Sequence, residues 1–185
     1  VGSEIKTSAK NSSETRLTLL VAPGQFCEII FKIFPEKRIP REGNWSTEVT
    51  LQIFELNTNN LLYEGKSQSS DLGKVVFEPC KEGSLLGGQS YDLLIRGLSH
   101  LSRSFKEVFL NDKRPTELEL QRKELLAGET STVYDNYVNA LDISTQVRAF
   151  NSTSDIKNDL NRDNKGNTLD ISNTIFNFYK SGEEN

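Results

Sequence analysis

Oxygen-bearing side chains recur at fixed intervals in residues 159–170, which read DLNRDNKGNTLD. They stand at positions 1, 3, 5, 9 and 12 of a twelve-residue loop. Calcium prefers about six to eight oxygen ligands, and a loop with this spacing offers them together with a backbone carbonyl from position 7. An Asx-rich surface turn that binds nothing is the alternative, but it does not account for the D-x-N-x-D spacing with an acid at position 12. The predicted calcium ligands are Asp159, Asn161, Asp163, the Lys165 carbonyl, Asp170, and Asn167 either directly or through a water.

Apolar residues with helical spacing follow this loop, and the same arrangement occurs 28 residues upstream. The i, i+4 and i+7 positions are Ile143, Val147 and Phe150 in the first copy, and Ile171, Ile175 and Phe178 in the second. Aligning residues 131–150 with residues 159–178 gives eight identities in twenty positions. The sequence therefore contains a duplicated unit of one loop and one helix.

The first loop departs from this pattern. If the register of the alignment is kept, Ser131 and Val133 occupy positions 1 and 3, and a valine side chain has no oxygen to offer. The segment carries about two extra residues, and we expect Glu129 or Thr130 to replace the missing ligand. The other predicted ligands of this loop are Asp135, the Tyr137 carbonyl, Asn139 and Asp142. Because fewer carboxylates mean lower calcium affinity, we expect a first site that is weaker than the second, empty, or structural only.

The tandem resembles the dockerin family, of type I, over about residues 127–180. NALDIS at 139–144 and NTLDIS at 167–172 match the phrases of that family closely. The resemblance implies two bound calcium ions, a compact helical pair with pseudo-twofold symmetry, and calcium-dependent docking onto a β-sandwich partner, the cohesin. It also implies recognition faces on or near Ala140, Leu141, Ser144, Thr168, Leu169 and Ser172.

The sequence ahead of this module predicts strands. Short apolar or alternating runs are separated by turn residues such as NTNN at 57–60. These runs cover residues 15–22, 26–34, 47–56, 61–65, 74–79, 91–98, 104–110 and 116–121. Such a series without helical periodicity predicts a mainly β fold, an Ig-like antiparallel β-sandwich followed by the small helical pair of EF-hand-like loops. Residues 45–121 also resemble the carboxypeptidase-regulatory-like and Ig-type sandwiches of bacterial surface proteins, which implies a spacer or adhesion module.

The predicted organisation has five parts. They are an N-terminal arm 1–14, a β-sandwich 15–121, a linker 122–128, the calcium-binding module 129–180 and a tail 181–185. Acidic and basic side chains number 17 each in residues 1–126, but nine and five in residues 127–185. A neutral domain followed by an acidic one argues against a nucleic-acid partner and suits a cation site.

Several features favour a secreted or cell-surface protein. No run approaches the roughly 18 apolar residues of a membrane span. The chain opens on Val1 and contains no Met, as expected after removal of a signal peptide. Cys27 and Cys80 match no metal-binding spacing, so they form either one disulfide or two buried thiols. The sequons at Asn11, Asn44 and Asn151 permit glycosylation.

The sequence contains no recognisable catalytic motif, and we expect no enzyme. His100 is the one histidine, and its place between two predicted strands favours a surface position. Lys32 lies in a strand, where an outward lysine protects an edge more often than it forms an isopeptide bond. Trp45 is more typical of a sandwich core than of a carbohydrate platform.

Two hypotheses for the function follow. In the first, copies of the protein associate into an extracellular fibre, because a docking module and a β-sandwich of the kind that docking modules bind occur in one chain. In the second, the module docks onto a separate cohesin in a secreted, cellulosome-like complex. The first hypothesis requires that the isolated protein associates with itself, and the second does not.

Overall fold

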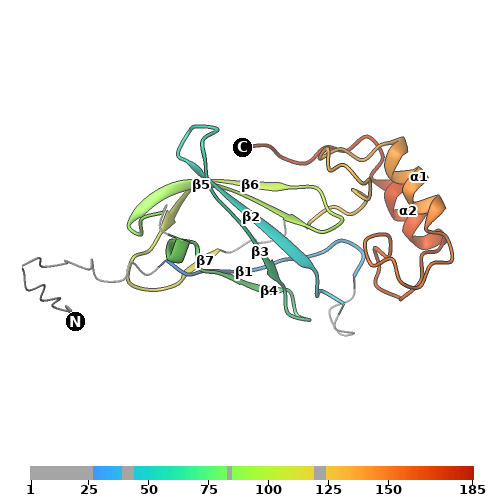
Figure 1. Ribbon diagram of the computed structural model, residues 1–185, viewed down its shortest axis with the longest axis horizontal. Coiled ribbons are helices and arrows are strands. Elements are labelled where there is room, and N and C mark those ends of the chain that lie inside the picture. The colour runs from blue at the N-terminus through green and yellow to red at the C-terminus, as the bar shows by residue number, and fades with distance from the viewer. Residues whose placement is uncertain (1–26, 39–43, 83–84, 119–123) are drawn as a thin grey trace, which may run out of the picture.

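The computed structural model describes residues 27–38, 44–82, 85–118 and 124–185. These residues form two facing β-sheets and, at one end of the long axis, a pair of α-helices (Figure 1). The predicted arm 1–14, the strand run 15–22 and the sequon at Asn11 lie outside the described residues.

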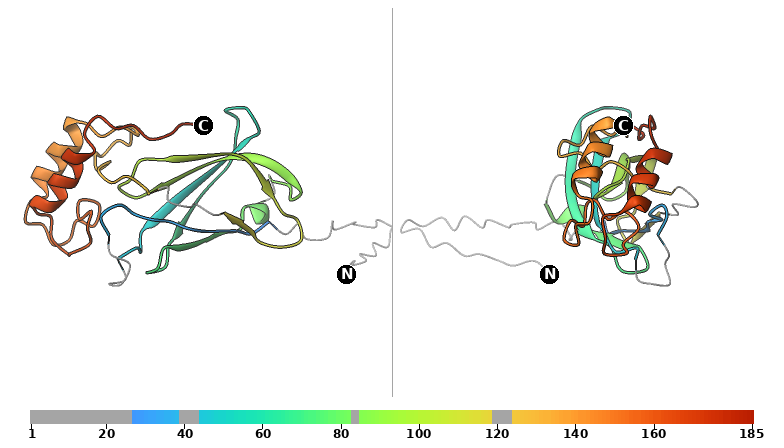
Figure 2. Two further views of the ribbon diagram at one scale, coloured as in Figure 1. Left: turned by 180° about the vertical axis from the view of Figure 1, so that it is seen from behind. Right: turned by 90° about the vertical axis from the view of Figure 1, so that its right-hand side faces the viewer.

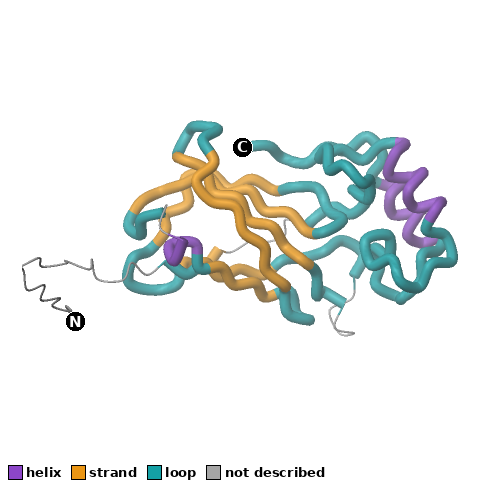
Figure 3. The backbone as a smooth tube through the Cα atoms, viewed as in Figure 1, coloured by secondary structure: helices purple, strands orange, loops and turns teal. Residues whose placement is uncertain are grey.

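Seven of the eight predicted strand runs are strands (Figure 3). Their bounds are β1 Ile29–Lys32, β2 Glu48–Glu55, β3 Leu61–Gln68, β4 Lys74–Phe77, β5 Gln89–Gly97, β6 Arg103–Leu110 and β7 Thr116–Leu118. The helices are the 3-10 helix η2 Pro79–Glu82, and α1 Ala140–Arg148 and α2 Thr168–Phe176 in the C-terminal module. Within the described ranges, no helix is long and apolar enough to cross a membrane.

The two sheets have the strand orders β4-β1-β7 and β3-β2-β5-β6. The mainly β sandwich is therefore confirmed. One pair departs from the predicted antiparallel arrangement, because β1 and β7 run parallel with Ile29 opposite Thr116. β7 reaches β1 only after the chain has passed through the other sheet, so no hairpin fixes the relative direction of the two strands.

Alternating apolar residues fill the space between the sheets. In β2 the side chains of Val49, Leu51 and Ile53 are fully buried, as their period of two predicts. Burying such a side chain stabilises the fold by about 1.5–3 kcal/mol. Trp45 is also buried, as expected, and the Lys32 ammonium lies over its ring at 5.0 Å, so this lysine makes a cation–π contact.

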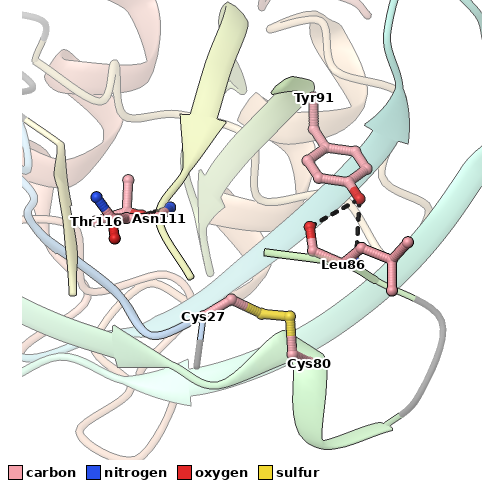
Figure 4. Close-up of a disulfide and its surroundings, with 6 residues drawn as sticks. All are labelled: Cys27, Cys80, Leu86, Tyr91, Asn111 and Thr116. Carbon is pink, nitrogen blue, oxygen red and sulfur yellow. Dashed lines mark hydrogen bonds between the residues drawn. A yellow bond between two sulfur atoms is a disulfide. The ribbon is translucent and has the colours of Figure 1, made fainter. Parts of the chain in front are cut away.

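Cys27 and Cys80 form a disulfide with Cα atoms 5.6 Å apart (Figure 4). Of the two alternatives that the sequence left open, the structure has the bonded one. The bridge joins the residue just before β1 to η2, and so fixes the end of the three-stranded sheet that lies away from the helices.

The helical module is fastened to the sandwich on two sides (Figure 2). On the way in, Leu125 and Ala127 are fully buried and form isolated bridges with Pro35 and His100. On the way out, the chain returns to the start of β6, where the Glu183 N–H donates to the Ser102 carbonyl at 3.0 Å. The segments that lead into and out of the helical module thus pack directly against the sandwich.

Candidate calcium loops and helix face

Three carboxylates of the second loop lie together. Oxygens of Asp159, Asp163 and Asp170 are all within 4.8 Å of one another, with Asp159 and Asp170 buried and Asp163 exposed. This is the one such cluster among the described residues. An all-oxygen set with several carboxylates is the donor set that calcium prefers, so these residues fit that ion.

The start of α2 sets the position of this cluster. Asp170 is the third residue of the helix, and its carboxylate accepts from the Asn167 N–H at 2.9 Å while the Asn167 side chain caps the helix. The other Asp170 oxygen accepts from the Leu160 N–H at 2.7 Å. One carboxylate therefore holds the beginning of the loop against the end of the loop.

Two of the three asparagines of the loop, Asn161 and Asn167, surround Asp163. Its carboxylate accepts from Asn161 Nδ2 at 3.1 Å and from Asn167 Nδ2 at 2.9 Å. A cation beside Asp163 requires amide oxygens instead. The Asn161 oxygen accepts from the Asp163 N–H at 3.1 Å and the Asn167 oxygen from the Leu169 N–H at 2.7 Å, so rotating either amide would exchange a backbone hydrogen bond for a contact with the ion.

Negative charge accumulates in the loop. Burial raises the pKa of Asp170 above its ordinary value, and the nearby Asp159 raises it further, against the hydrogen bonds that the carboxylate accepts. A bound cation would remove this repulsion. The cluster is thus suited electrostatically, as well as geometrically, to a divalent ion.

The first loop repeats this construction with Glu129 at its start. The Thr130 and Ser131 N–H groups donate to Asp142 at 2.7 and 2.8 Å, as the Leu160 N–H does to the equivalent aspartate of the second loop. Glu129 therefore occupies position 1, and Ser131, the candidate for that position in the unshifted register, comes two residues later. The two extra residues lie between Glu129 and Asp135.

The rest of the first loop matches the second. Asn139 Nδ2 donates to Asp135 at 2.9 Å and to the Tyr137 carbonyl at 3.2 Å, as Asn167 does in its own loop. Glu129 is fully buried. Burial first, and then the nearby Asp142 and Asp135, raise the pKa of Glu129 to about 7. The structure brings together all five residues predicted for this loop.

The two helices present apolar side chains to solvent and polar ones to the interior. In α1 the buried residues are Asp142 and Gln146, and in α2 they are Asp170 and Thr174. On the two helices and just after α1, the exposed large apolar residues, 45–63% accessible, are Leu141, Val147, Phe150, Leu169, Ile175 and Phe176. The six residues predicted to contact a partner, Ala140, Leu141, Ser144, Thr168, Leu169 and Ser172, are all exposed. Exposed apolar side chains on both units make one helix face a candidate docking surface.

A buried basic cluster joins the second loop to the sandwich. Arg38, only 6% exposed, donates from Nε to the Leu160 carbonyl at 2.8 Å. Burial, and then the nearby Arg162, lower the pKa of Arg38 to about 9, whereas Asp159 opposes this change. No pattern in the sequence indicates this contact, because Arg38 and Leu160 are 122 residues apart.

His100 belongs to the same joint. The prediction of a surface histidine is wrong, since the side chain is fully buried. Burial, together with the charges of Arg38 and Arg162, holds the pKa of His100 well below its ordinary value, so the ring is neutral. Of the sequons within the described residues, Asn151 is exposed and Asn44 is half-buried.

No protein-family model and no curated protein matches this sequence. Solved structures do match its fold. A chain in a type II cohesin–X-dockerin complex from Acetivibrio cellulolyticus, a C-terminal interface mutant, matches with a TM-score of 0.57 and 17% identity over 84% of this chain and 97% of that chain. A chain in the N-terminal interface mutant of that complex matches with a TM-score of 0.53 and 16% identity over 86% and 98% of the two chains.

These matches include more than the sandwich. Residues 1–121 make up about two thirds of the chain, so an alignment over 84% of it must extend into the helical module. At this level of identity the likeness concerns the fold. This chain therefore shares its mainly β architecture with a component of a cohesin–dockerin complex.

Proposed function

We propose that this chain is a non-enzymatic, extracellular assembly protein whose helical module, held by calcium, docks onto a β-sandwich partner of cohesin type. The observation that carries this proposal is the helix face, where large apolar side chains are exposed on both loop-helix units while carboxylates and amides face inward. Apolar groups gathered on one face of a small module are typical of a protein-binding surface.

Calcium would fix the geometry of this face. Each helix begins within a loop, and the carboxylates of Asp142 and Asp170 tie loop to helix. A cation in each loop would neutralise the clustered acids and hold the helix starts, which carry Leu141 and Leu169, in place. The second loop, with its three converging carboxylates, would bind more tightly than the first.

An extracellular location agrees with two features. The Cys27–Cys80 disulfide is typical of oxidising compartments, and calcium loops of moderate affinity fill at the calcium levels found outside cells.

The matching structures favour a separate partner. Both are complexes of a cohesin with an X-dockerin chain, and both match this chain across the sandwich and into the helical module. We therefore prefer docking onto a cohesin to the alternative of a fibre built by the helix face alone. Self-association through another surface is compatible with this function.

The proposal can be tested by calorimetric titration of the full chain with purified type I and type II cohesin domains, with calcium or with a chelator. We expect saturable binding in calcium and none with the chelator. Leu141→Glu with Leu169→Glu should abolish binding and leave folding intact, because glutamate in the first turn suits the helix dipole. The matched control is Leu72→Glu, which alters an equally exposed leucine of the β3–β4 turn. Binding that persists in the double variant would exclude the helix face.

A further inference from the structure

The joint between the sandwich and the second loop buries more hydrogen-bond donors than it satisfies. On the sandwich side lie Arg38, only 6% exposed, and His100, which is fully buried. On the module side lie Asn158, also buried, and Arg162, whose Nε is buried. Among the described residues, no hydrogen-bond partner is present for Arg38 Nη2, Arg162 Nε, Asn158 Oδ1 and both ring nitrogens of His100. Because buried polar atoms without a partner are costly, a group of them marks a place where a ligand can bind.

The two guanidinium groups lie in the same part of this joint. Arg38 Nη1 donates to the Ser46 carbonyl at 3.4 Å, and Arg162 Nη2 donates to the Thr47 hydroxyl at 3.5 Å. Ser46 and Thr47 are consecutive residues, so the two arginines are held near one another. On its other side Arg38 is fixed by the bond from Nε to the Leu160 carbonyl at 2.8 Å. Each guanidinium therefore keeps one nitrogen free of protein partners while its other nitrogens hold it in place.

The ring of His100 belongs to the same group. Its Nδ1 lies against the backbone of Gly97, where a Cβ would be only 2.6 Å away, so Nε2 is the nitrogen that points away from β5. The neighbouring Ser99 Oγ donates to the Lys157 carbonyl at 2.6 Å, which holds this turn against the start of the second loop. Burial, together with the charges of the two arginines, holds the pKa of His100 well below its ordinary value. The neutral ring can therefore offer one N–H donor to the joint.

The positive charge of the arginine pair is only partly balanced. Asp159 is the acid whose charge acts on both arginines, but its two oxygens accept from the Asp163 and Asn164 N–H groups at 3.1 and 2.9 Å. Within the described ranges, no carboxylate forms an ion pair with Arg38 or Arg162. Burial, and then the like charge of Arg162, lower the pKa of Arg38 to about 9. Two arginines and one aspartate thus leave one positive charge in excess.

We propose that the joint binds a small monovalent anion, chloride, between the guanidinium groups of Arg38 and Arg162 and the ring of His100. A buried water could pair with the donors but would bring no charge. Chloride accepts hydrogen bonds from N–H groups and also balances the excess positive charge. Because the donors are buried, the site suits an ion of one atom and not a sulfate or a carboxylate. Such an ion would hold the second loop against the sandwich, at a place apart from the helix face and independent of docking.

Urea unfolding of the full chain in a calcium chelator tests this site. When about 0.2 M gluconate, whose anion is too large to be buried, is replaced by chloride, the unfolding equilibrium constant at a fixed urea concentration should fall at least about fivefold. The fall should grow with the chloride concentration. Arg162→Gln, which removes one guanidinium group, should lose this dependence. Arg148→Gln, on the exposed side of α1, is the matched control and should keep it, and circular dichroism should show both variants folded.

Crystals grown in sodium bromide locate the ion, and we expect an anomalous peak between Arg38, Arg162 and His100. A wild type whose stability is the same in chloride and gluconate would overturn the proposal, since a water would then satisfy the donors. A bromide peak without chloride-dependent stability would mean an adventitious ion only and would also overturn it. So would a peak that lies elsewhere, or an equal chloride effect in the Arg162 variant. If that variant does not fold, the wild-type titration and the bromide position decide.

Discussion

One carboxylate in each loop, Asp163 in the second and Glu129 in the first, has a special environment. Asp163 lies in an exposed turn, yet two asparagine side chains and a backbone N–H converge on it. Glu129 lies at the opposite extreme, fully buried between other acids. Asp163 is thus accessible to an ion from solvent. The Glu129 carboxylate, by contrast, lies close to other acids and, among the described residues, to no compensating positive charge.

Asp163→Ala should weaken calcium binding at the second loop by roughly tenfold or more, because the central carboxylate of the cluster is lost. The helical signal of α2 in calcium should fall, since the remaining acids repel one another around a poorly held ion. Calcium titration followed by circular dichroism measures both effects. Asp112→Ala, which removes an exposed acid of the sandwich, is the control. Unchanged calcium uptake and helix content in the Asp163 variant would refute the site.

Glu129 makes the stability of the calcium-free protein depend on pH. Its pKa is raised to about 7 in the folded state, above the ordinary value of 4.5. The folded state therefore binds the proton more tightly than the unfolded chain does, and this contribution is present at low pH and is lost as the pH rises through 7.

In chelator, the free energy of unfolding should fall between pH 5 and pH 8 by up to about 3 kcal/mol from this residue. Glu129→Gln should remove that decline, and urea unfolding at the two pH values measures it. If the variant and the wild type lose the same stability over this interval, Glu129 is not the group that titrates.

At the scale of elements, the sequence predicts what depends on local pattern. The seven described strands follow from short apolar or alternating runs and turn residues, and the two helices follow from the apolar residues at i, i+4 and i+7 after each loop. The parallel pairing of β1 with β7 does not follow, because it depends on the path of the whole chain. Neither does the burial of His100, nor the choice between Glu129 and Thr130 for the start of the first loop, which the two-residue insertion leaves open.

The disulfide is the strongest link between two elements. It closes a loop with a sequence separation of 53 residues, which restricts the unfolded chain and stabilises the fold by about 4 kcal/mol. Reduction, or Cys27→Ser with Cys80→Ser, should therefore lower the urea midpoint of the sandwich. Equal midpoints for the oxidised and reduced proteins would show that the bond contributes nothing to stability.

At the scale of the whole molecule, the helical module and the sandwich share a joint that is mostly polar. Arg38 reaches across it to the Leu160 carbonyl, and Ser99 Oγ donates to the Lys157 carbonyl at 2.6 Å. Asn177 Nδ2 donates to Glu36 at 2.5 Å and to the Ala127 carbonyl at 2.8 Å. Directed bonds of this kind fix the orientation of the helix face relative to the long axis of the sandwich.

Arg38→Met should disturb this joint while leaving the core of the sandwich unchanged. The Leu160 carbonyl loses its partner within the second loop, so we expect weaker calcium binding there and a loss of about 1–3 kcal/mol in the free energy of unfolding. Calcium titration and urea unfolding measure the two effects, with Arg148→Met on the exposed side of α1 as the control. Calcium affinity equal to that of the wild type would show that the joint and the loop are independent.

The parallel pair of β1 and β7 has a mechanical consequence. β1 runs roughly along the long axis, and the chain enters it at Cys27, at the end opposite the helices (Figure 1). A tension that enters through residues ahead of Cys27 and leaves through the helix face would load the β1–β7 hydrogen bonds in shear, so they would have to break together. The Cys27–Cys80 bond would pass part of that tension directly to η2 and β4. If the chain is tethered at both ends, it should therefore resist stretching more strongly than its equilibrium stability suggests.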